Sequence, residues 1–248
     1  MENNYGAWRH EINFFASLCM PVFINQYTVK NSNISLKNAA GKNGNIWMLL
    51  PLFGTVVFVC LYITATLFYP GGSQVDETSK GFSWANNYWC NLLNEKAMNG
   101  QLNPARPIAI TAMFILCCTL ANFWWIFPQQ VGFKRDIRFT IQISGLLAMI
   151  VGMLLFTNLH DTVVNAASLC GLIATVGTFA GLRKLNWKKL FWLGIFNLLL
   201  VALNNILYYG NGLKLYLPVV QKITFFFFLL WICLINIKLF NKNKYETV

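Results

Sequence analysis

The residues with the clearest chemical potential form a polar pair that is followed by further polar side chains at helical spacing. His160 and Asp161 are adjacent, and Asp161, Asn165 and Ser168 fall at positions i, i+4 and i+7, so they share one face if this segment is helical. A histidine beside a carboxylate could act as acid and base in a hydrolase or transferase that acts on lipid. Asp161 could instead cap the first turn of the helix, a structural role without chemistry.

Other residue types give an enzymatic interpretation little support. A catalytic zinc site commonly uses three His or carboxylate ligands, and the chain has two histidines, of which His10 is predicted to lie across a membrane from His160. No GxSxG turn marks Ser73, Ser79 or Ser83 as a nucleophile. We therefore expect no metal and no cofactor.

A wider polar set could bind a ligand rather than transform one. Ionisable residues at a membrane boundary are costly to desolvate and need partners, and several such residues are predicted to reach the same level beneath tryptophans of a long loop. Lys222 could alternatively extend its stem toward the lipid head groups. The predicted ligand-binding residues are Arg106, His160, Asp161, Asn165, Asn204, Asn205, Lys222, Trp84 and Trp89.

The segments that must position these residues are apolar. Of 248 residues, 56% are hydrophobic and 11% are charged, which is not the balance of a soluble domain. The net charge of +11 has no recognition-helix pattern beside it, so nucleic acid is not an expected partner. A membrane-spanning helix needs about 20 mostly apolar residues. The predicted spans are 46–69, 107–127, 137–159, 161–182, 190–209 and 215–240.

Alternate loops differ in positive charge, and this difference predicts orientation. Fourteen of the 19 Lys and Arg residues lie on one side of the predicted spans, and cytoplasmic loops retain positive charge. We expect an all-α, polytopic six-helix bundle with cytoplasmic N and C termini. Its parts are a cytoplasmic leader at 1–44, interpreted as either an interfacial helix or a mobile segment, a membrane domain at 45–240 with an outer loop at 70–106, and a cytoplasmic tail at 241–248.

The outer loop is rich in aromatic and turn-forming residues. It opens with Pro70-Gly71-Gly72 and ends near Asn103-Pro104, both of which are turn signals. Aromatic residues at helical spacing predict a short amphipathic helix over 82–96 that caps the outer end of the bundle.

The third and fourth predicted spans form a hairpin with small residues facing inward. Gly145, Ala148 and Gly152 lie on the third span, and Gly177 and Gly181 lie on the fourth. Small residues four apart allow close approach of helix backbones in lipid. This pattern predicts tight helix packing and no chemistry.

Three short motifs carry a resemblance to a known group. They are Leu67-Phe68-Tyr69-Pro70-Gly71, Asn103-Pro104-Ala105-Arg106-Pro107 and Leu159-His160-Asp161. Over residues 46–240 the chain resembles bacterial six-helix membrane proteins related to the damage-regulated autophagy modulator, Frag and Sfk families. The resemblance implies a bacterial cytoplasmic (inner) membrane location and a role in lipid organisation or membrane-protein regulation, although the long Asn-rich leader departs from the pattern.

These observations lead to three functional hypotheses. The first is a protein, not an enzyme, that binds lipid or a small amphiphile in an outer-leaflet pocket, or that regulates a membrane-protein partner or a second copy of itself through that surface. The second is a membrane-embedded lipid hydrolase or transferase that uses His160 and Asp161. The third is a small transporter, although the Gly and Pro positions of the first three spans do not recur in the last three.

Overall fold

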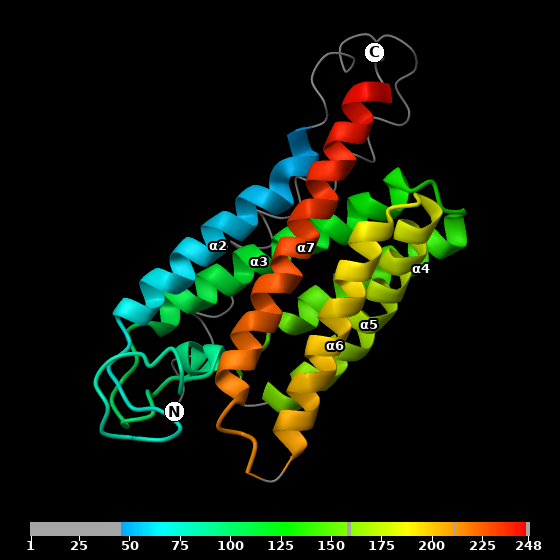
Figure 1. Ribbon diagram of the computed structural model, residues 1–248. Helices are drawn as coiled ribbons and strands as arrows, with labels where there is room; N and C mark the ends of the chain where they lie inside the picture. The colour runs from blue at the N-terminus through cyan, green and yellow to red at the C-terminus, as the bar shows by residue number, and fades with distance from the viewer. Residues whose placement is uncertain (1–45, 158–159, 211, 247–248) are drawn as a thin grey trace.

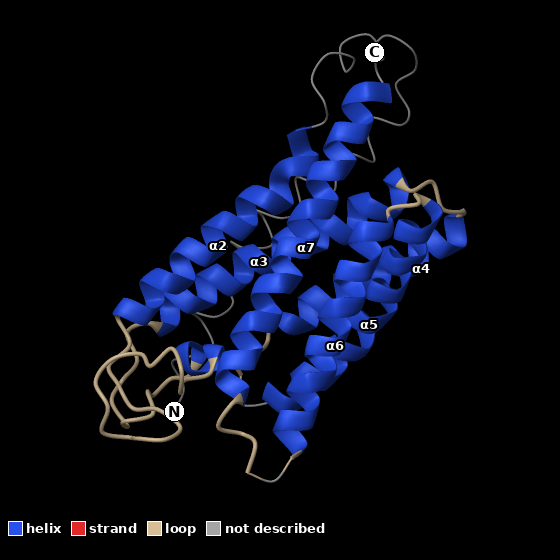
Figure 2. Cartoon of the chain, viewed as in Figure 1, coloured by secondary structure: helices blue, strands red, loops and turns tan. Residues whose placement is uncertain are grey.

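All regular secondary structure in the described chain is helical, as predicted. The computed structural model describes residues 46–157, 160–210 and 212–246, so the predicted leader at 1–44 lies outside the described residues. A short 3-10 helix, η1 (Ile46–Leu49), precedes the first long helix, and a second, η2 (Trp89–Leu93), lies in the loop that follows it (Figures 1 and 2). The α-helices are α2 (Leu50–Leu67), α3 (Arg106–Gln130), α4 (Arg135–Gly152), α5 (His160–Lys184), α6 (Lys188–Tyr209) and α7 (Leu217–Glu246).

Five of these helices, namely α2, α3, α5, α6 and α7, are long and apolar enough to cross a membrane. The prediction of a multi-pass integral membrane protein is therefore confirmed by helix length and composition. α4 differs, because its 18 residues begin with Arg135, Asp136 and Arg138. The predicted third span continues to residue 159, whereas α4 ends at Gly152 and the chain then forms turns through Thr157.

The helices pack mainly against their sequence neighbours. α3 lies between α2 and α4, α4 pairs with α5, and α7 contacts both α6 and α2 (Figure 1). The loop between α2 and α3 lies at one end of the bundle, beside the first turns of α7, and the α3–α4 and α5–α6 turns lie at the opposite end. The core is rich in aromatic side chains, and its largest fully buried members include Phe58, Tyr62, Phe123, Phe127 and Trp231.

Glycines permit close helix contacts, but not all in the predicted pairing. A Cβ atom at position 145 would lie 2.5 Å from the Cβ of Trp124, so Gly145 faces α3 rather than α5. Gly177 does face α4, since a side chain there would overlap Ile141. Small residues of the predicted hairpin therefore serve two interfaces, because α4 is enclosed by α3 on one side and α5 on the other.

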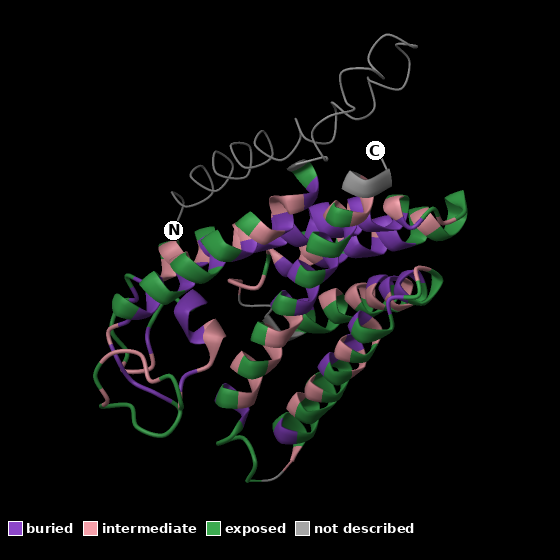
Figure 3. Ribbon diagram, turned by 45° about the horizontal axis from the view of Figure 1, so that its top comes forward, coloured by how far each residue is buried: buried purple, intermediate pink, exposed green. Residues whose placement is uncertain are grey.

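The outward faces of the helices are strongly apolar. In Figure 3 exposed residues run along the lengths of α5 and α6. Exposed fractions reach 65% for Leu169, 67% for Trp192 and 63% for Leu199. Soluble proteins rarely expose contiguous apolar surface on this scale, and lipid is the solvent that suits these faces.

Candidate functional site

The loop between α2 and α3 is folded, and buried asparagines hold it. Asn87 is fully buried; its Oδ1 accepts a hydrogen bond from the Ser83 amide at 2.8 Å, and its Nδ2 donates to the Gly72 carbonyl at 2.8 Å. The predicted amphipathic helix over 82–96 is wrong, because regular helix is confined to η2. Asparagine side chains that bind backbone groups favour turns over a continuous helix.

Asn103 joins the end of this loop to η2. Its Nδ2 donates to the carbonyl oxygens of Asn91, Leu92 and Asn94 at 3.3, 3.1 and 2.9 Å, and its Oδ1 accepts from the Ala105 amide at 3.1 Å. The residue that marks a turn in the sequence thus anchors several segments at once. The loop caps the ends of α2, α3 and α7, as the sequence predicts (Figure 1).

Aromatic rings connect the loop to the bundle. The Trp89 ring lies 4.6 Å from Tyr62 of α2, 6.0 Å from Trp84 and 6.2 Å from Phe225 of α7, measured between ring centroids. The Tyr62 hydroxyl donates to the Trp89 carbonyl at 3.2 Å. We refer to the connected rings as the aromatic cap, which consists of Tyr62, Tyr69, Phe82, Trp84, Trp89 and Phe225.

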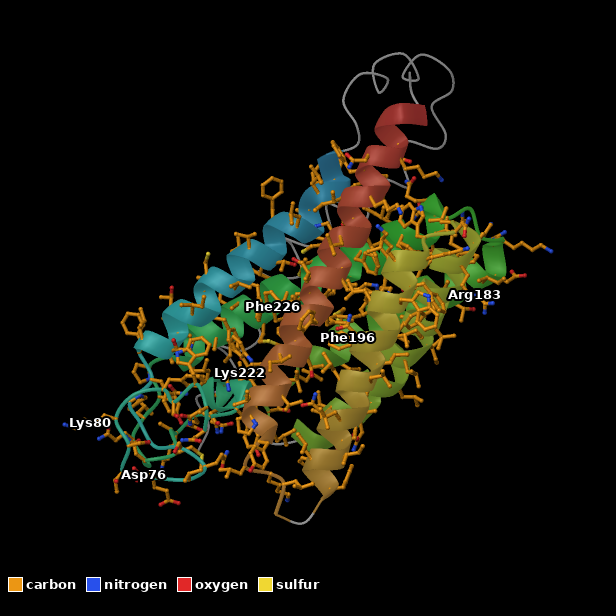
Figure 4. All side chains as sticks on the ribbon, viewed as in Figure 1. Asp76, Lys80, Arg183, Phe196, Lys222 and Phe226 are labelled. Atoms are coloured by element: carbon orange, nitrogen blue, oxygen red, sulfur yellow. The ribbon has the colours of Figure 1, made fainter. Side chains whose placement is uncertain are left out.

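Lys222 of α7 reaches into this cap. Its ammonium group donates to the carbonyls of Asn87 at 2.6 Å and Pro218 at 2.9 Å, and it lies 5.6 Å from the centroid of the Phe82 ring. Figure 4 shows Lys222 at the end of α7 that faces the loop. In the described part of the chain no carboxylate pairs with this partly buried cation. Among the described residues, its hydrogen-bond partners are the two carbonyl oxygens, and the ring face of Phe82 lies beside it.

Two buried hydrogen-bond donors near the cap lack an acceptor among the described residues. The indole Nε1 of Trp89 and the Nε of Arg106 are buried and have no hydrogen-bond partner among the described residues. The Arg106 amide donates to the Asn103 carbonyl, so this residue begins α3 directly beside the loop. A buried donor without an acceptor carries a desolvation penalty, so a ligand with acceptor oxygens would suit this end of the bundle.

Asp76 of the loop binds its own turn and does not pair with Lys222. Asp76 is exposed, and its Oδ1 accepts from the Thr78 hydroxyl at 2.7 Å and the Thr78 amide at 2.8 Å. These bonds hold the pKa of the Asp76 carboxyl below its ordinary value. The bonds to Thr78 are thus strongest above that pKa and are lost as the pH falls through it. Asp76 stabilises its own turn instead of lining a pocket.

The other predicted residues are placed less closely together. Asn204 faces α7, where its Nδ2 donates to the Thr224 hydroxyl at 2.5 Å, and its buried Oδ1 has no partner among the described residues. Asn165 and Asn205 lie on exposed faces of α5 and α6. His160 and Asp161 begin α5, but their side chains lie outside the described part, so the acid–base pair stays a prediction.

The structure therefore brings together Lys222, Trp84 and Trp89, with Arg106 next to η2. Two further residues join this group. The Oε1 of Gln221 accepts a hydrogen bond from the Trp89 amide at 3.3 Å, and the backbone carbonyl of Asn87 accepts one from the Lys222 ammonium. Gln221 and Asn87 are not among the predicted residues. The signal for Gln221 is its position beside Lys222, where two polar residues interrupt an apolar span.

Within residues 46–157, 160–210 and 212–246, no group of three His, Cys, Asp or Glu residues could hold a metal ion. Comparison of the chain with protein-family models, curated proteins and solved structures finds no match. The resemblance to the six-helix group thus stays a prediction.

Proposed function

We propose that this multi-pass membrane protein binds a lipid or small amphiphile beneath the aromatic cap, in the outer leaflet of a bacterial cytoplasmic membrane. The observation that carries the proposal is Lys222, a partly buried cation held by two carbonyls and a ring, with no carboxylate partner in the described chain. The indole Nε1 of Trp89 and the Nε of Arg106 lie at the same end and have no hydrogen-bond partner among the described residues. An anionic or ester-bearing head group would supply the missing oxygens.

The proposal requires six membrane crossings, so α4 must cross the membrane in addition to the five candidate spans. α3 starts at the loop end of the bundle and finishes at the other, so the chain must return before α5 can run in the same direction (Figure 1). α4 has 18 residues, and a helix of that length spans about 27 Å, close to the hydrocarbon thickness of roughly 30 Å. Its apolar residues Phe139, Leu147 and Ile150 are exposed, as lipid-facing residues would be.

The orientation follows from charge. The end that carries the α3–α4 and α5–α6 turns is the more basic, so we place it in the cytoplasm together with both termini. The loop end then faces outward. Trp84 is 48% exposed, Val75 60% and Leu102 74% on this loop, and apolar residues of this kind would lie among the head groups.

The apolar tail of a bound amphiphile would lie along α7. Ile223 and Phe226 follow Lys222 on this helix and are 42% and 62% exposed. A head group at the cap and a tail on this face would give a site for one amphiphile. Regulation of a membrane-protein partner, or contact with a second copy of the chain, would use the same exposed surface.

The test is retention of a defined amphiphile by the purified protein. Native mass spectrometry in a maltoside detergent would count bound lysophosphatidylglycerol on the wild type and on Lys222→Met. Loss of one charge-assisted hydrogen bond should weaken binding about 10- to 100-fold. Lys214→Met is the matched control, because Lys214 is exposed at the same end and lies 5.4 Å from the Tyr208 ring.

A conservative variant separates binding from folding. Lys222→Arg keeps the charge and should retain most of the bound amphiphile, whereas Lys222→Met should not. If Lys222→Met binds as well as the wild type, or if Lys214→Met loses as much, Lys222 does not hold the head group and the proposal is wrong.

A further inference from the structure

The two ends of the bundle differ sharply in charge. At the loop end, the basic residues are accompanied by Asp76, Glu77 and Glu95. At the opposite end, Asp136 is the single acidic residue whose side chain is described. The basic residues of that opposite end are Lys134, Arg135, Arg138, Arg183, Lys184, Lys188, Lys189, Lys238 and Lys242.

Part of this charge is concentrated around the turn between α5 and α6. Figure 4 places Arg183 at this end, far from Lys222. The Lys184 ammonium donates to the Gly132 carbonyl at 2.6 Å, which brings the α3–α4 turn to the same place. We define the cationic patch by its exposed members, which are Arg183, Lys184, Lys188, Lys189 and Lys238.

Aromatic rings orient the patch. The Arg183 guanidinium lies 5.9 Å from the centroid of the Phe191 ring, and the Lys238 ammonium lies 4.8 Å from that of Trp187. Trp187 is buried at the turn and precedes α6. Each contact positions one cation against a ring, and both cations remain exposed.

The described part of the chain supplies no counter-charge to the patch. Among the described residues no acidic side chain pairs with any of its members, and the first turn of α6 contains no acidic residue. Lys188 and Lys189 occupy that first turn, where the helix already carries partial positive charge. The resulting repulsion remains within the protein and would be relieved by an external anion.

The position of the patch indicates the source of that anion. The candidate membrane spans of α5 and α6 end at Lys184 and begin at Lys188, so the patch lies where hydrocarbon gives way to head groups. Directly beyond it, α6 exposes Trp192 and Leu199. Cations next to an exposed apolar face fit a molecule that has an anionic head and acyl chains.

We infer that the cationic patch binds an anionic glycerophospholipid, with its phosphate among Arg183, Lys188 and Lys189 and its chains along the exposed face of α6. This site is separate from the aromatic cap and lies at the opposite end of the bundle. It does not depend on the proposed function, because neither Lys222 nor the loop contributes to it.

The test compares lipid selectivity between two variants that lose the same charge. The full chain in maltoside would be incubated with equal amounts of phosphatidylglycerol and phosphatidylcholine and examined by native mass spectrometry. The triple variant Arg183→Gln/Lys188→Gln/Lys189→Gln should lose the preference for phosphatidylglycerol by roughly a hundredfold, since each cation near an anionic lipid contributes about fivefold. The control Lys80→Gln/Lys96→Gln/Lys214→Gln, exposed at the loop end, should keep it.

Three results would overturn the inference. They are unchanged selectivity in the triple variant, equal loss in the loop-end control, and displacement of the lipid by inorganic phosphate at matched ionic strength, which would make free phosphate the occupant. Every form would also carry Lys222→Met, so that the aromatic cap does not contribute to the selectivity and failure at one end can be distinguished from failure at the other. The side chains replaced by Gln are all exposed, and size-exclusion chromatography would verify folding.

Discussion

Asparagine side chains anchor the loop and thereby fix the positions of the backbone groups in the candidate site. Asn87 and Asn103 are 0% and 4% exposed, and each binds backbone groups of two or more segments. Because Asn87 is fixed in this way, its carbonyl is held where the Lys222 ammonium can reach it at 2.6 Å. The residues that hold the loop therefore also shape the candidate binding site.

Asn103→Ala should destabilise the loop by about 1–3 kcal/mol, because the Ala105 amide and the carbonyls around η2 lose a buried partner. The matched control is Asn94→Ala, since the Asn94 side chain is exposed. Limited proteolysis in detergent would measure the effect as faster cleavage between α2 and α3. Equal cleavage rates in the two variants would show that Asn103 does not anchor the loop.

At the scale of helices, glycine determines how closely α4 approaches α3. Position 145 has no room for a side chain, because the Cβ of Trp124 occupies the space and cannot rotate away. A Cβ atom at position 152, on the same helix, would lie 3.8 Å from the Sγ atom of Cys117, which is an ordinary van der Waals contact. The two glycines look alike in the sequence but differ in the tertiary structure.

Gly145→Ala should therefore lower stability by about 1–3 kcal/mol through overpacking, whereas Gly152→Ala should change it little. Thermal unfolding followed by intrinsic fluorescence in the same detergent would compare the two midpoints with the wild type. A midpoint for Gly145→Ala that matches Gly152→Ala would contradict the close approach of α3 and α4.

For the whole molecule, the separation of charge is the property on which orientation depends. Basic residues gather at the end opposite the loop, where Asp136 is the single acidic residue whose side chain is described, and apolar faces cover the length between. An exposed loop residue and an exposed residue of the α5–α6 turn should consequently lie on opposite sides of a membrane.

Cysteine labelling tests this arrangement directly. In a variant without native cysteines, an impermeant maleimide added to intact cells should label Glu77→Cys at once and Lys189→Cys only after permeabilisation. Both side chains are exposed in the folded chain, so a difference in their labelling would report the membrane between them. Lys214→Cys is the control and should behave like Glu77→Cys. Labelling of Glu77→Cys and Lys189→Cys from the same side would invalidate the proposed six crossings.

The sequence alone determined the all-α class and the approximate helices, because apolar segments about 20 residues long leave lipid-exposed backbone no alternative to helix. It also predicted that Lys222, Trp84 and Trp89 lie at the same end, since a cation and tryptophans near span ends are conspicuous; their role as a binding site stays a prediction. Only the tertiary structure decided that Asn87 and Gln221 join them, that Asn165 and Asn205 face outward, and that Gly145 contacts α3. These outcomes depend on how each helix is rotated and on which turns the loop adopts, and both are set by contacts between residues far apart in the chain.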